Sequence, residues 1–163
     1  VRDLIESKQF GVEYIIAPMV ETPYALQKFI LAKNKVYSTD QQEDTEFLFN
    51  VETITTYNNL PQMMEVARTP NGVQGAVFGR VDFSGSMGLA RNAIDTDQIT
   101  DYVRKTGAAC KESGLDLVVG GAVAISSLPE LNKMRDTPLT RFETRKVVFG
   151  SDSPTLPLSL IHL

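Results

Sequence analysis

Five short runs of apolar, partly β-branched residues recur along the chain, and each is followed by a polar or glycine-containing break and then by a helical pattern. Most of these runs are continuously apolar, which is typical of strands buried on both faces of a parallel sheet. The runs cover residues 14–20, 46–51, 73–79, 115–123 and 142–149. This repetition predicts an α/β fold made of βα units.

Helix start and stop signals lie between the runs. Thr22 followed by Pro23 is typical of an N-cap and a proline in the first helical position. Asp95 or Thr96 is expected to cap a later helix, and Gly114 is a suitable residue to end it. These signals predict one helix after the first run and another before the fourth.

Other segments have local signals of their own. Ser127 and Glu130 have the spacing of a capping box, in which each side chain bonds a main-chain amide of the first helical turn. Residues 2–8 have the pattern of a helix, and the polar residues 37–45 suit a solvated turn. Residues 151–163 contain two prolines and no helical period. We therefore expect a folded domain over residues 1–150 and an irregular C-terminal tail over residues 151–163.

Hydrophobic periodicity leaves two architectures open, an open doubly wound sheet and a closed barrel. A Rossmann-type sheet is expected to have G-x-G-x-x-G after an early strand, and the chain has no such motif. A complete (β/α)8 barrel needs about 250 residues. The 163 residues of this chain would supply only part of one.

Composition and charge exclude some classes of function. The 42% hydrophobic and 22% charged residues are ordinary for a globular protein. A net charge of -4, without a dense run of Lys and Arg, argues against nucleic acid as a partner. The longest apolar stretches are shorter than the roughly 20 residues of a membrane span, and the N-terminus lacks a signal-peptide pattern. We expect a cytoplasmic protein without a membrane partner, whose one cysteine, Cys110, packs within a helix.

Two acidic residues follow strand runs. Glu52 closes EFLFNVE, and Asp82 closes AVFGRVD. Catalytic side chains of barrels collect at the carboxyl ends of strands, and these two strands would be neighbours. Two converging carboxylates, completed by water and substrate oxygens, suit Mg²⁺ or Mn²⁺. The alternative at this point is that both acids only cap helices or face solvent.

Four segments together resemble a known family. They are IIAPMVET, FLFNVETITTYNNLPQMM, GVQGAVFGRVDFSGSMG and FETRKVVF. They are similar to successive strand ends of the HpcH/HpaI aldolase and citrate lyase beta-subunit family, a branch of the pyruvate and phosphoenolpyruvate-utilising TIM barrels. The most specific feature is a strand ending in Glu, followed one βα unit later by G-x-x-D-[FL]-S-x-S-x-G. The resemblance implies that the chain supplies about the last five βα units, strands 4 to 8, of a (β/α)8 barrel.

The resemblance also implies roles for individual residues. It assigns the metal ligands to Glu52 and Asp82, with Glu21 in PMVET as a competing candidate for the glutamate. The residues that it places around the substrate are Asn50, Gly79, Arg80, Val81 and Ser84. Asn50 occupies a position where the family often has a substrate-contacting Gln. The main-chain amides of residues 79–81 are expected to bind the carboxylate of a pyruvate-like substrate.

Some of these positions have two interpretations. The family commonly has Gly-Pro-Ala at residues 79–81, so Arg80 either adds positive charge near the substrate or is a surface arginine. Ser84 and Ser86 either bind the substrate or stabilise a strained loop. Gly120 and Gly121 mark either a close backbone approach at the barrel mouth or a bend.

The remaining candidates are interpreted as structural or unimportant for catalysis. Arg145 and Lys146 lie on a predicted strand, where one of them must point outward. His162 is the only histidine and lies in the tail, which argues against a histidine metal site or a catalytic triad.

The preferred interpretation is a divalent-metal-dependent carbon–carbon lyase of the aldolase or citrate lyase type, acting on a small 2-oxo acid or an acyl-CoA thioester through a metal-stabilised enolate. The family's catalytic arginine and histidine base would lie before Val1, so no residue here is assigned to either role. The alternatives are an inactive fragment that binds oxo acid and metal, and an α/β interaction module. Because five strands cannot close a barrel, we expect a homo-oligomer.

Overall fold

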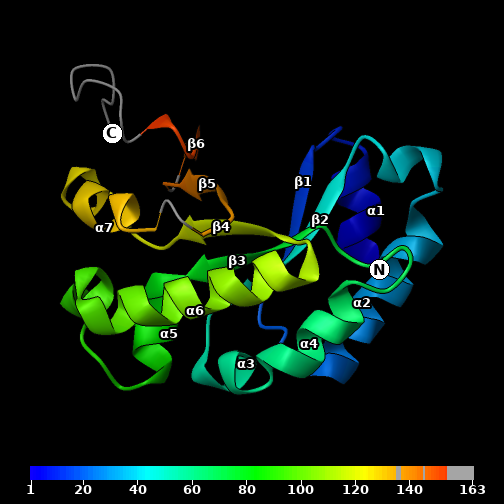
Figure 1. The fold of residues 1–163 in the computed structure, drawn as a ribbon. Helices are drawn as coiled ribbons and strands as arrows, with labels where there is room; N and C mark the ends of the chain where they lie inside the picture. The colour runs from blue at the N-terminus through cyan, green and yellow to red at the C-terminus, as the bar shows by residue number, and fades with distance from the viewer. Residues whose placement is uncertain (135–136, 145, 154–163) are drawn as a thin grey trace.

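The computed structural model describes residues 1–134, 137–144 and 146–153 (Figure 1). The strands are β1 (Tyr14–Ala17), β2 (Glu46–Val51), β3 (Gly75–Gly79), β4 (Asp116–Gly120), β5 (Leu139–Glu143) and β6 (Val148–Gly150). The α-helices are α1 (Arg2–Lys8), α2 (Pro23–Val36), α3 (Ile54–Asn58), α4 (Leu60–Ala67), α5 (Arg80–Ser86), α6 (Asp97–Ser113) and α7 (Leu128–Asn132). Short 3-10 helices are η1 (Asp40–Gln42), η2 (Arg91–Asp95) and η3 (Ile125–Ser127).

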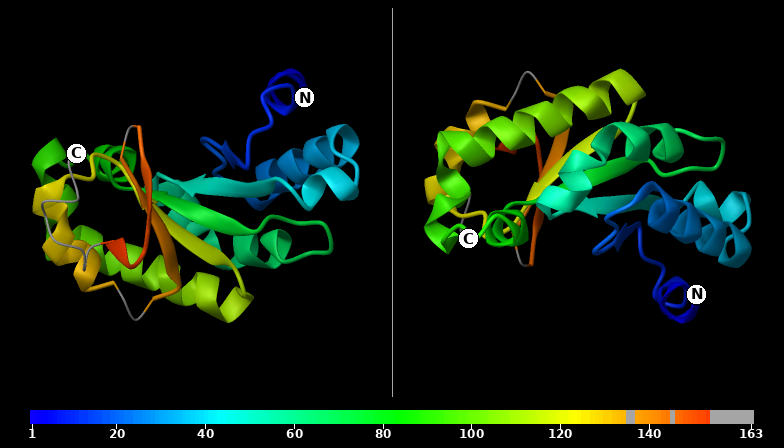
Figure 2. Two further views of the ribbon diagram at one scale, coloured as in Figure 1. Left: turned by 90° about the horizontal axis from the view of Figure 1, so that it is seen from above. Right: turned by 90° about the horizontal axis from the view of Figure 1, so that it is seen from below.

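The six strands form one sheet in which their spatial order is their order along the chain. Strands β1 to β5 are parallel, and β6 is antiparallel to β5. A doubly wound sheet reverses its strand order at a switch point, and this sheet does not. The strand direction turns progressively from β1 to β5, so the sheet curls (Figure 2). The predicted α/β fold is confirmed, and the curled sheet is consistent with part of a TIM barrel. The assignment to barrel strands 4 to 8 stays a prediction.

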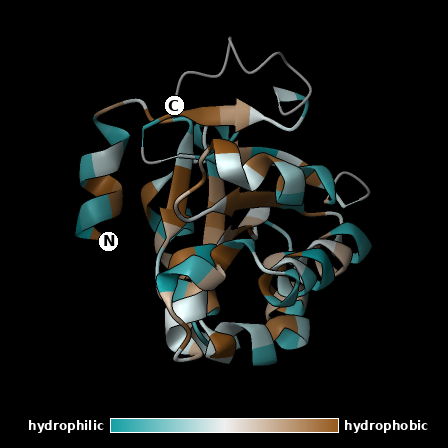
Figure 3. Cartoon of the chain, turned by 90° about the vertical axis from the view of Figure 1, so that its left-hand side faces the viewer, coloured by the Kyte–Doolittle hydropathy of each residue, from teal (hydrophilic) through white to brown (hydrophobic). Residues whose placement is uncertain are grey.

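Most of the hydrophobic core lies between one face of this sheet and the helices. On that face α2 packs against α4, and α4 packs against α6 (Figure 1). Phe47 and Phe49 belong to this core, whereas Leu48 forms a smaller cluster with Val77 and Val118 on the concave face. Successive residues of a strand point to opposite faces, so a strand that is apolar on both faces reads as a continuous run. The strands are accordingly hydrophobic along most of their length, whereas hydrophobic and hydrophilic residues alternate along the helices (Figure 3).

One edge of the sheet is open. Within the described residues, β1 pairs only with β2 and has no strand on its other side. An unpaired edge presents free amides and carbonyls to another chain. The expected homo-oligomer depends on this feature, and the oligomeric state stays a prediction. None of the described helices is long and apolar enough to cross a membrane.

Two predicted helix boundaries are confirmed. Thr22 is the N-cap of α2, where its hydroxyl accepts a hydrogen bond from the Ala25 amide at 3.1 Å. Gly114 ends α6 in the left-handed conformation with φ +67°, which glycine adopts without a steric penalty. Cys110 is fully buried in α6, as predicted, and burial raises the pKa of its thiol to about 12.

The last predicted strand is wrong in its extent. Residues 142–149 do not form one strand, because β5 ends at Glu143 and the chain turns before β6. In the turn, the Thr144 hydroxyl accepts a hydrogen bond from the Val147 amide at 3.1 Å, and the Thr144 amide donates to the Val147 carbonyl at 2.9 Å. Such local side-chain bonds compete with strand pairing, so the chain turns between the apolar residues Phe142 and Val147.

The predicted capping box at α7 is also wrong. The Ser127 hydroxyl is buried and bonds the Ala124 amide at 3.4 Å and the Arg80 guanidinium at 3.3 Å. Glu130 accepts a hydrogen bond from the Thr100 hydroxyl at 2.9 Å. Both side chains have tertiary partners in place of the helix amides that their spacing suggested.

Lys33 in α2 is a buried amine without a carboxylate partner among the described residues. It is 0% exposed and donates hydrogen bonds to the side-chain oxygens of Asn34 and Gln42 at 2.9 and 2.5 Å. Its Nζ lies 4.9 Å from the centre of the Phe47 ring. Burial lowers the pKa of Lys33 from 10.5 to about 8.

We expect the free energy of unfolding of the wild type to rise between about pH 8 and 10.5, relative to that of Lys33→Met. In this window the unfolded chain binds a proton at Lys33 that the folded chain does not, so raising the pH stabilises the fold. The gain should be on the order of 2 kcal/mol. Urea unfolding at several pH values measures it, with the exposed Lys35→Met on the same helix as the control. Parallel pH profiles for the wild type and Lys33→Met would contradict this assignment.

Candidate functional site

Glu52 is the first residue after β2, at the carboxyl end of the strand, and is 6% exposed. Its Oε1 accepts a hydrogen bond from the Met19 amide at 2.7 Å, and its Oε2 accepts one from Asn50 Nδ2 at 3.0 Å. Met19 has φ +52°, a strained conformation of the kind that clusters at functional sites. The Glu52 carboxylate is therefore held in one orientation, and each of its oxygens can accept a further bond. Asn50 directs its amide at Glu52, and its contact with substrate stays a prediction.

Asp82 lies in the first turn of α5 and does not close a strand. The predicted run 73–79 ends where β3 ends, at Gly79, but the prediction that Asp82 closes this strand is wrong, because the chain enters the helix at Arg80. Asp82 is exposed, and among the described residues its carboxylate has no hydrogen-bond or ion-pair partner. A negative charge in the first turn also stabilises the helix. The predicted helix-terminal role and a ligand role are thus compatible at this position.

The side chains of Glu52 and Asp82 line one pocket of about 570 Å³ at the carboxyl ends of β2 and β3. Its other lining residues are Met19, Thr53, Val81, Gly85, Ser86, Leu89 and Arg91. Glu21 is not among them, and its carboxylate accepts a hydrogen bond from the Thr53 hydroxyl at 2.8 Å. The fold brings together the predicted pair of acids and leaves the competing glutamate outside the pocket.

A larger hollow of about 650 Å³ lies at the opposite end of the sheet. It includes Glu46 and Asp116, which begin β2 and β4. Catalytic groups of barrels collect at the carboxyl ends of the strands, whereas the amino ends contribute stability. We therefore assign the functional site to the smaller pocket.

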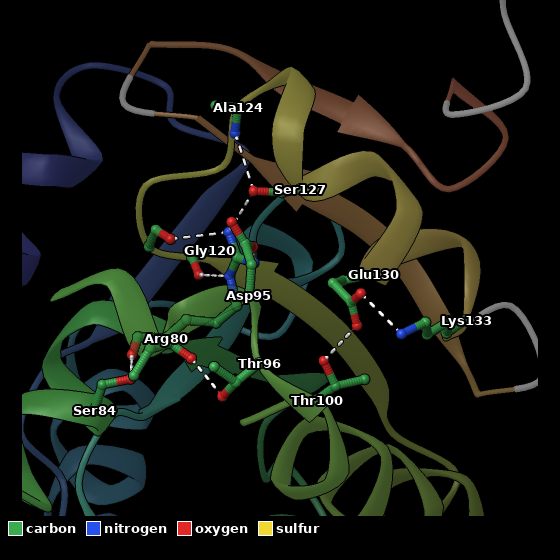
Figure 4. Close-up of polar contacts among 12 residues, drawn as sticks. Arg80, Ser84, Asp95, Thr96, Thr100, Gly120, Ala124, Ser127, Glu130 and Lys133 are labelled. Atoms are coloured by element: carbon green, nitrogen blue, oxygen red, sulfur yellow. Dashed lines mark hydrogen bonds and ion pairs between the residues drawn. The ribbon is translucent and has the colours of Figure 1, made fainter. Parts of the chain in front are cut away.

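Arg80 is the first residue of α5 and is only 1% exposed. Its Nε donates to the Gly120 carbonyl at 3.3 Å, and its Nη1 donates to Asp95 Oδ1 at 2.7 Å. Its Nη2 donates to the Gly121 carbonyl at 3.1 Å and to the Ser127 hydroxyl at 3.3 Å (Figure 4). One side chain therefore joins the start of α5 to the end of β4, to η2 and to η3.

This arrangement corrects both predictions for Arg80. It is not a surface arginine, and its guanidinium donates to internal acceptors and not into the pocket. Burial lowers the pKa of Arg80, and the Asp95 carboxylate opposes that effect. Because an arginine stays charged, Arg80 and Asp95 form an ion pair at the inner edge of the site. Asp95 was a candidate N-cap of α6, and Thr96 occupies that position in its place.

The two serines of the motif stabilise the α5 segment. Ser84 is 0% exposed, and its hydroxyl donates to the Arg80 carbonyl at 2.8 Å. The Ser86 hydroxyl accepts a hydrogen bond from the Ile54 amide at 2.8 Å and donates to the Phe83 carbonyl at 2.7 Å. The predicted contact of the Ser84 side chain with substrate does not follow from this geometry, since the hydroxyl is buried and used within the helix.

Gly121 follows β4 and lies against the start of α5. It has φ +87°, and a Cβ atom added to it would lie 2.7 Å from the Arg80 nitrogen and 2.8 Å from the Val81 nitrogen. These two amides are the first of the helix and have no acceptor within it. Gly121 therefore marks a close backbone approach of the end of β4 to the start of α5, one of its two predicted roles.

Sequence reasoning missed some residues at this edge of the sheet. Met19 supplies a main-chain amide and Arg91 a positive charge. Met19 lies in the segment IIAPMVET, but only the structure shows its amide directed at Glu52. Lys146 is exposed. Arg145 and His162 lie outside the described residues.

The pair of carboxylates suits a hard divalent cation. Mg²⁺ is commonly held by one or two carboxylates, with water and substrate oxygens in the other positions. Among the described residues, no group of three or more His, Cys, Asp and Glu side chains could hold a metal ion unaided. Glu52, with its fixed orientation, and Asp82, which is unpaired, supply two oxygen ligands to one pocket. The donor set thus fits a cation that shares its coordination with a substrate.

Comparison with known proteins gives one match by sequence. The sequence profile of the HpcH/HpaI aldolase/citrate lyase family matches residues 1–128. No curated protein matches the chain.

Several solved structures share the fold. Citrate synthase SbnG is 16% identical with a TM-score of 0.67, and the match covers 88% of this chain and 61% of that chain. RipC from Yersinia pestis is 19% identical with a TM-score of 0.63, and the match covers 86% of this chain and 62% of RipC. An HpcH/HpaI aldolase from Desulfitobacterium hafniense DCB-2 is 10% identical with a TM-score of 0.66, and the match covers 82% of this chain and 58% of that aldolase. This chain spans between 58% and 62% of the length of these three proteins.

Proposed function

Because the chain belongs to the HpcH/HpaI aldolase/citrate lyase family, we propose that it carries the metal and substrate site of a carbon–carbon lyase. The substrate is a small 2-oxo acid or an acyl-CoA thioester, and the reaction proceeds through an enolate. Glu52 and Asp82 hold Mg²⁺ or Mn²⁺. The observation that carries this proposal is the shared pocket of the two carboxylates at the carboxyl ends of adjacent parallel strands.

Each part of the site has a separate task in this proposal. The cation, when bound, polarises the carbonyl of the substrate. Asn50 and the Met19 amide hold Glu52 in place through the bonds to its two oxygens. The main-chain amides of Arg80 and Val81, which have no acceptor within the helix, bind the substrate carboxylate. Preorganised donors of this kind need no rearrangement when the substrate arrives, which is why they are effective.

Glu52→Gln and Asp82→Asn should each weaken Mg²⁺-dependent binding of oxalate, a pyruvate-like ligand, by about 100-fold or more. Changes to groups that merely orient metal ligands cost 10–100-fold, and loss of a ligand oxygen should cost at least as much. Isothermal titration calorimetry measures the affinity. Glu21→Gln removes a neighbouring acid that the pocket does not include, and it should bind oxalate like the wild type.

The outcomes separate the candidate functions. Oxalate binding that is lost in both variants and kept in Glu21→Gln supports the proposed site. Binding without exchange of the pyruvate methyl protons in heavy water would identify an inactive binding fragment. Unchanged metal affinity in Asp82→Asn would indicate that the acids serve only as helix-terminal charges, and it would contradict the proposal. The use of coenzyme A and the cytoplasmic location stay predictions.

A further inference from the structure

Glu143 ends β5 and lies in a row of residues that crosses four neighbouring strands at their carboxyl ends. Gly79 is the register partner of Gly120 in the β3–β4 pair. On one side of these glycines, a Cβ atom added to Gly79 would lie 3.0 Å from Glu52 Cβ. On the other side, a Cβ atom added to Gly120 would lie 2.5 Å from Glu143 Oε1. The row therefore reads Glu52, Gly79, Gly120 and Glu143.

The two central glycines leave the floor of this row without side chains. Neighbouring strands are about 4.8 Å apart, so the backbones of the two outer positions are separated by on the order of 14 Å, or less where the sheet curls. The two glutamate side chains extend from either end over this floor. Glu52 lines the pocket at one end of the row, and the Arg80 and Val81 amides lie against Gly121, the residue that follows Gly120.

The Glu143 carboxyl group has no hydrogen-bond or ion-pair partner among the described residues. It borders a small cavity of about 40 Å³ on the concave face, which is lined mainly by apolar side chains of β1, β2, β4 and β6. The titratable and charged groups that share this cavity are Tyr14 and Arg141. Arg141 is paired with Glu46 at 3.1 Å and with Asp116 at 3.6 Å, toward the opposite end of the strands. The half-buried carboxyl is therefore left uncompensated.

This environment is that of a proton-transfer group. Burial raises the pKa of Glu143 above its ordinary value. A carboxyl group whose pKa moves toward neutrality is a more effective acid or base at physiological pH. Nothing in the fold requires an acid here, because no described residue pairs with it.

We propose that Glu143 is a catalytic residue of the same site, a carboxylate that removes and returns the proton on the carbon next to the substrate carbonyl. The proposal rests on the proposed function, because it needs a 2-oxo acid bound near Glu52 and Asp82. In pyruvate, the C–H bond of the methyl group breaks, its electron pair enters the enolate, and the proton moves to a Glu143 oxygen. The reverse transfer restores the methyl group, so the step is balanced without a further reactant. This role gives the described chain a base of its own.

Glu143→Gln should slow the exchange of pyruvate methyl protons in heavy water by at least 100-fold. Glu143→Asp should retain part of the exchange, since it keeps a shorter carboxylate. Mg²⁺-dependent oxalate affinity should stay within about twofold in both variants, because Glu143 is not a ligand of the cation. The thermal midpoint of Glu143→Gln should stay the same or rise, as the variant removes a half-buried charge without a partner. Glu112→Gln on the exposed side of α6 is the charge-matched control.

A carboxyl ¹³C NMR titration of Glu143, compared with the pH dependence of the exchange rate, distinguishes a catalytic role from a structural one. Its midpoint should lie above the ordinary pKa of a glutamate, because the carboxyl is half-buried, and should match the rise of the exchange rate with pH. Exchange in Glu143→Gln at the wild-type rate would overturn the proposal. Exchange absent from a wild type that binds oxalate would also overturn it, while the metal and oxo-acid site would stand. Failure of the wild type to bind oxalate with Mg²⁺ would remove both.

Discussion

Replacing Arg80 by methionine is expected to lower the free energy of unfolding by about 3–5 kcal/mol, the usual effect of removing one partner from a buried charged pair. The methionine can fill part of the volume, but it leaves the Gly120 and Gly121 carbonyls and the Ser127 hydroxyl without their donor. Thermal unfolding measures the effect. A loss of this size should lower the midpoint by roughly 10 °C for a chain of this length.

Three comparison variants locate the source of the loss. Arg80→Lys keeps the charge but cannot reach all four acceptors, so it should recover only part of the stability. Asp95→Asn keeps a hydrogen-bond acceptor for Arg80 and should cost less than Arg80→Met, since Asp95 is 30% exposed at its side chain. Arg68→Met removes an exposed arginine paired with Glu65, and it should change stability by less than about 1 kcal/mol. If Arg80→Met were no worse than Arg68→Met, the buried network would not stabilise the fold.

Gly121→Ala should be the most damaging small substitution at the site. The left-handed φ of +87° costs an alanine about 1–2 kcal/mol. Its methyl group would also lie within 2.8 Å of two main-chain nitrogens, those of Arg80 and Val81, which cannot move without shifting the start of α5. Overpacking of this kind adds about 1–3 kcal/mol. A shift of these two amides, the proposed donors to the substrate carboxylate, should also lower the oxalate affinity together with stability.

Gly114→Ala is the matched control for this substitution. Gly114 has a similar positive φ of +67°, but no atom lies within 4 Å of an added Cβ. It should therefore show the conformational cost alone, about 1–2 kcal/mol, with unchanged oxalate affinity. Urea unfolding and calorimetry on the two variants measure both effects. Equal losses of stability at Gly121 and Gly114 would show that the close approach of β4 to α5 is unimportant.

Several features of this protein were predictable because they depend on short stretches of chain. The apolar run of β2 is continuous since the strand is buried on both faces, and the end of α6 is encoded in Gly114 itself. The β5–β6 hairpin was missed because the predicted strand was extended across the polar residues Glu143 and Thr144, and the hydrogen bonds between Thr144 and Val147 mark the turn. The capping box at Ser127 was wrong because its spacing is local, while its partner Arg80 is 47 residues away.

The sequence by itself determined strands β1 to β4 in outline and that Glu52 and Asp82 come after neighbouring strands, since parallel strands bring their carboxyl ends to one edge of a sheet. Only the tertiary structure decided which polar groups meet there. The burial of Arg80 against β4 and the position of Glu143 beside Gly120 depend on strand register and on Gly120 and Gly121, which have no Cβ atom. Pairings of that kind join residues tens of positions apart, and no periodicity along the chain encodes them.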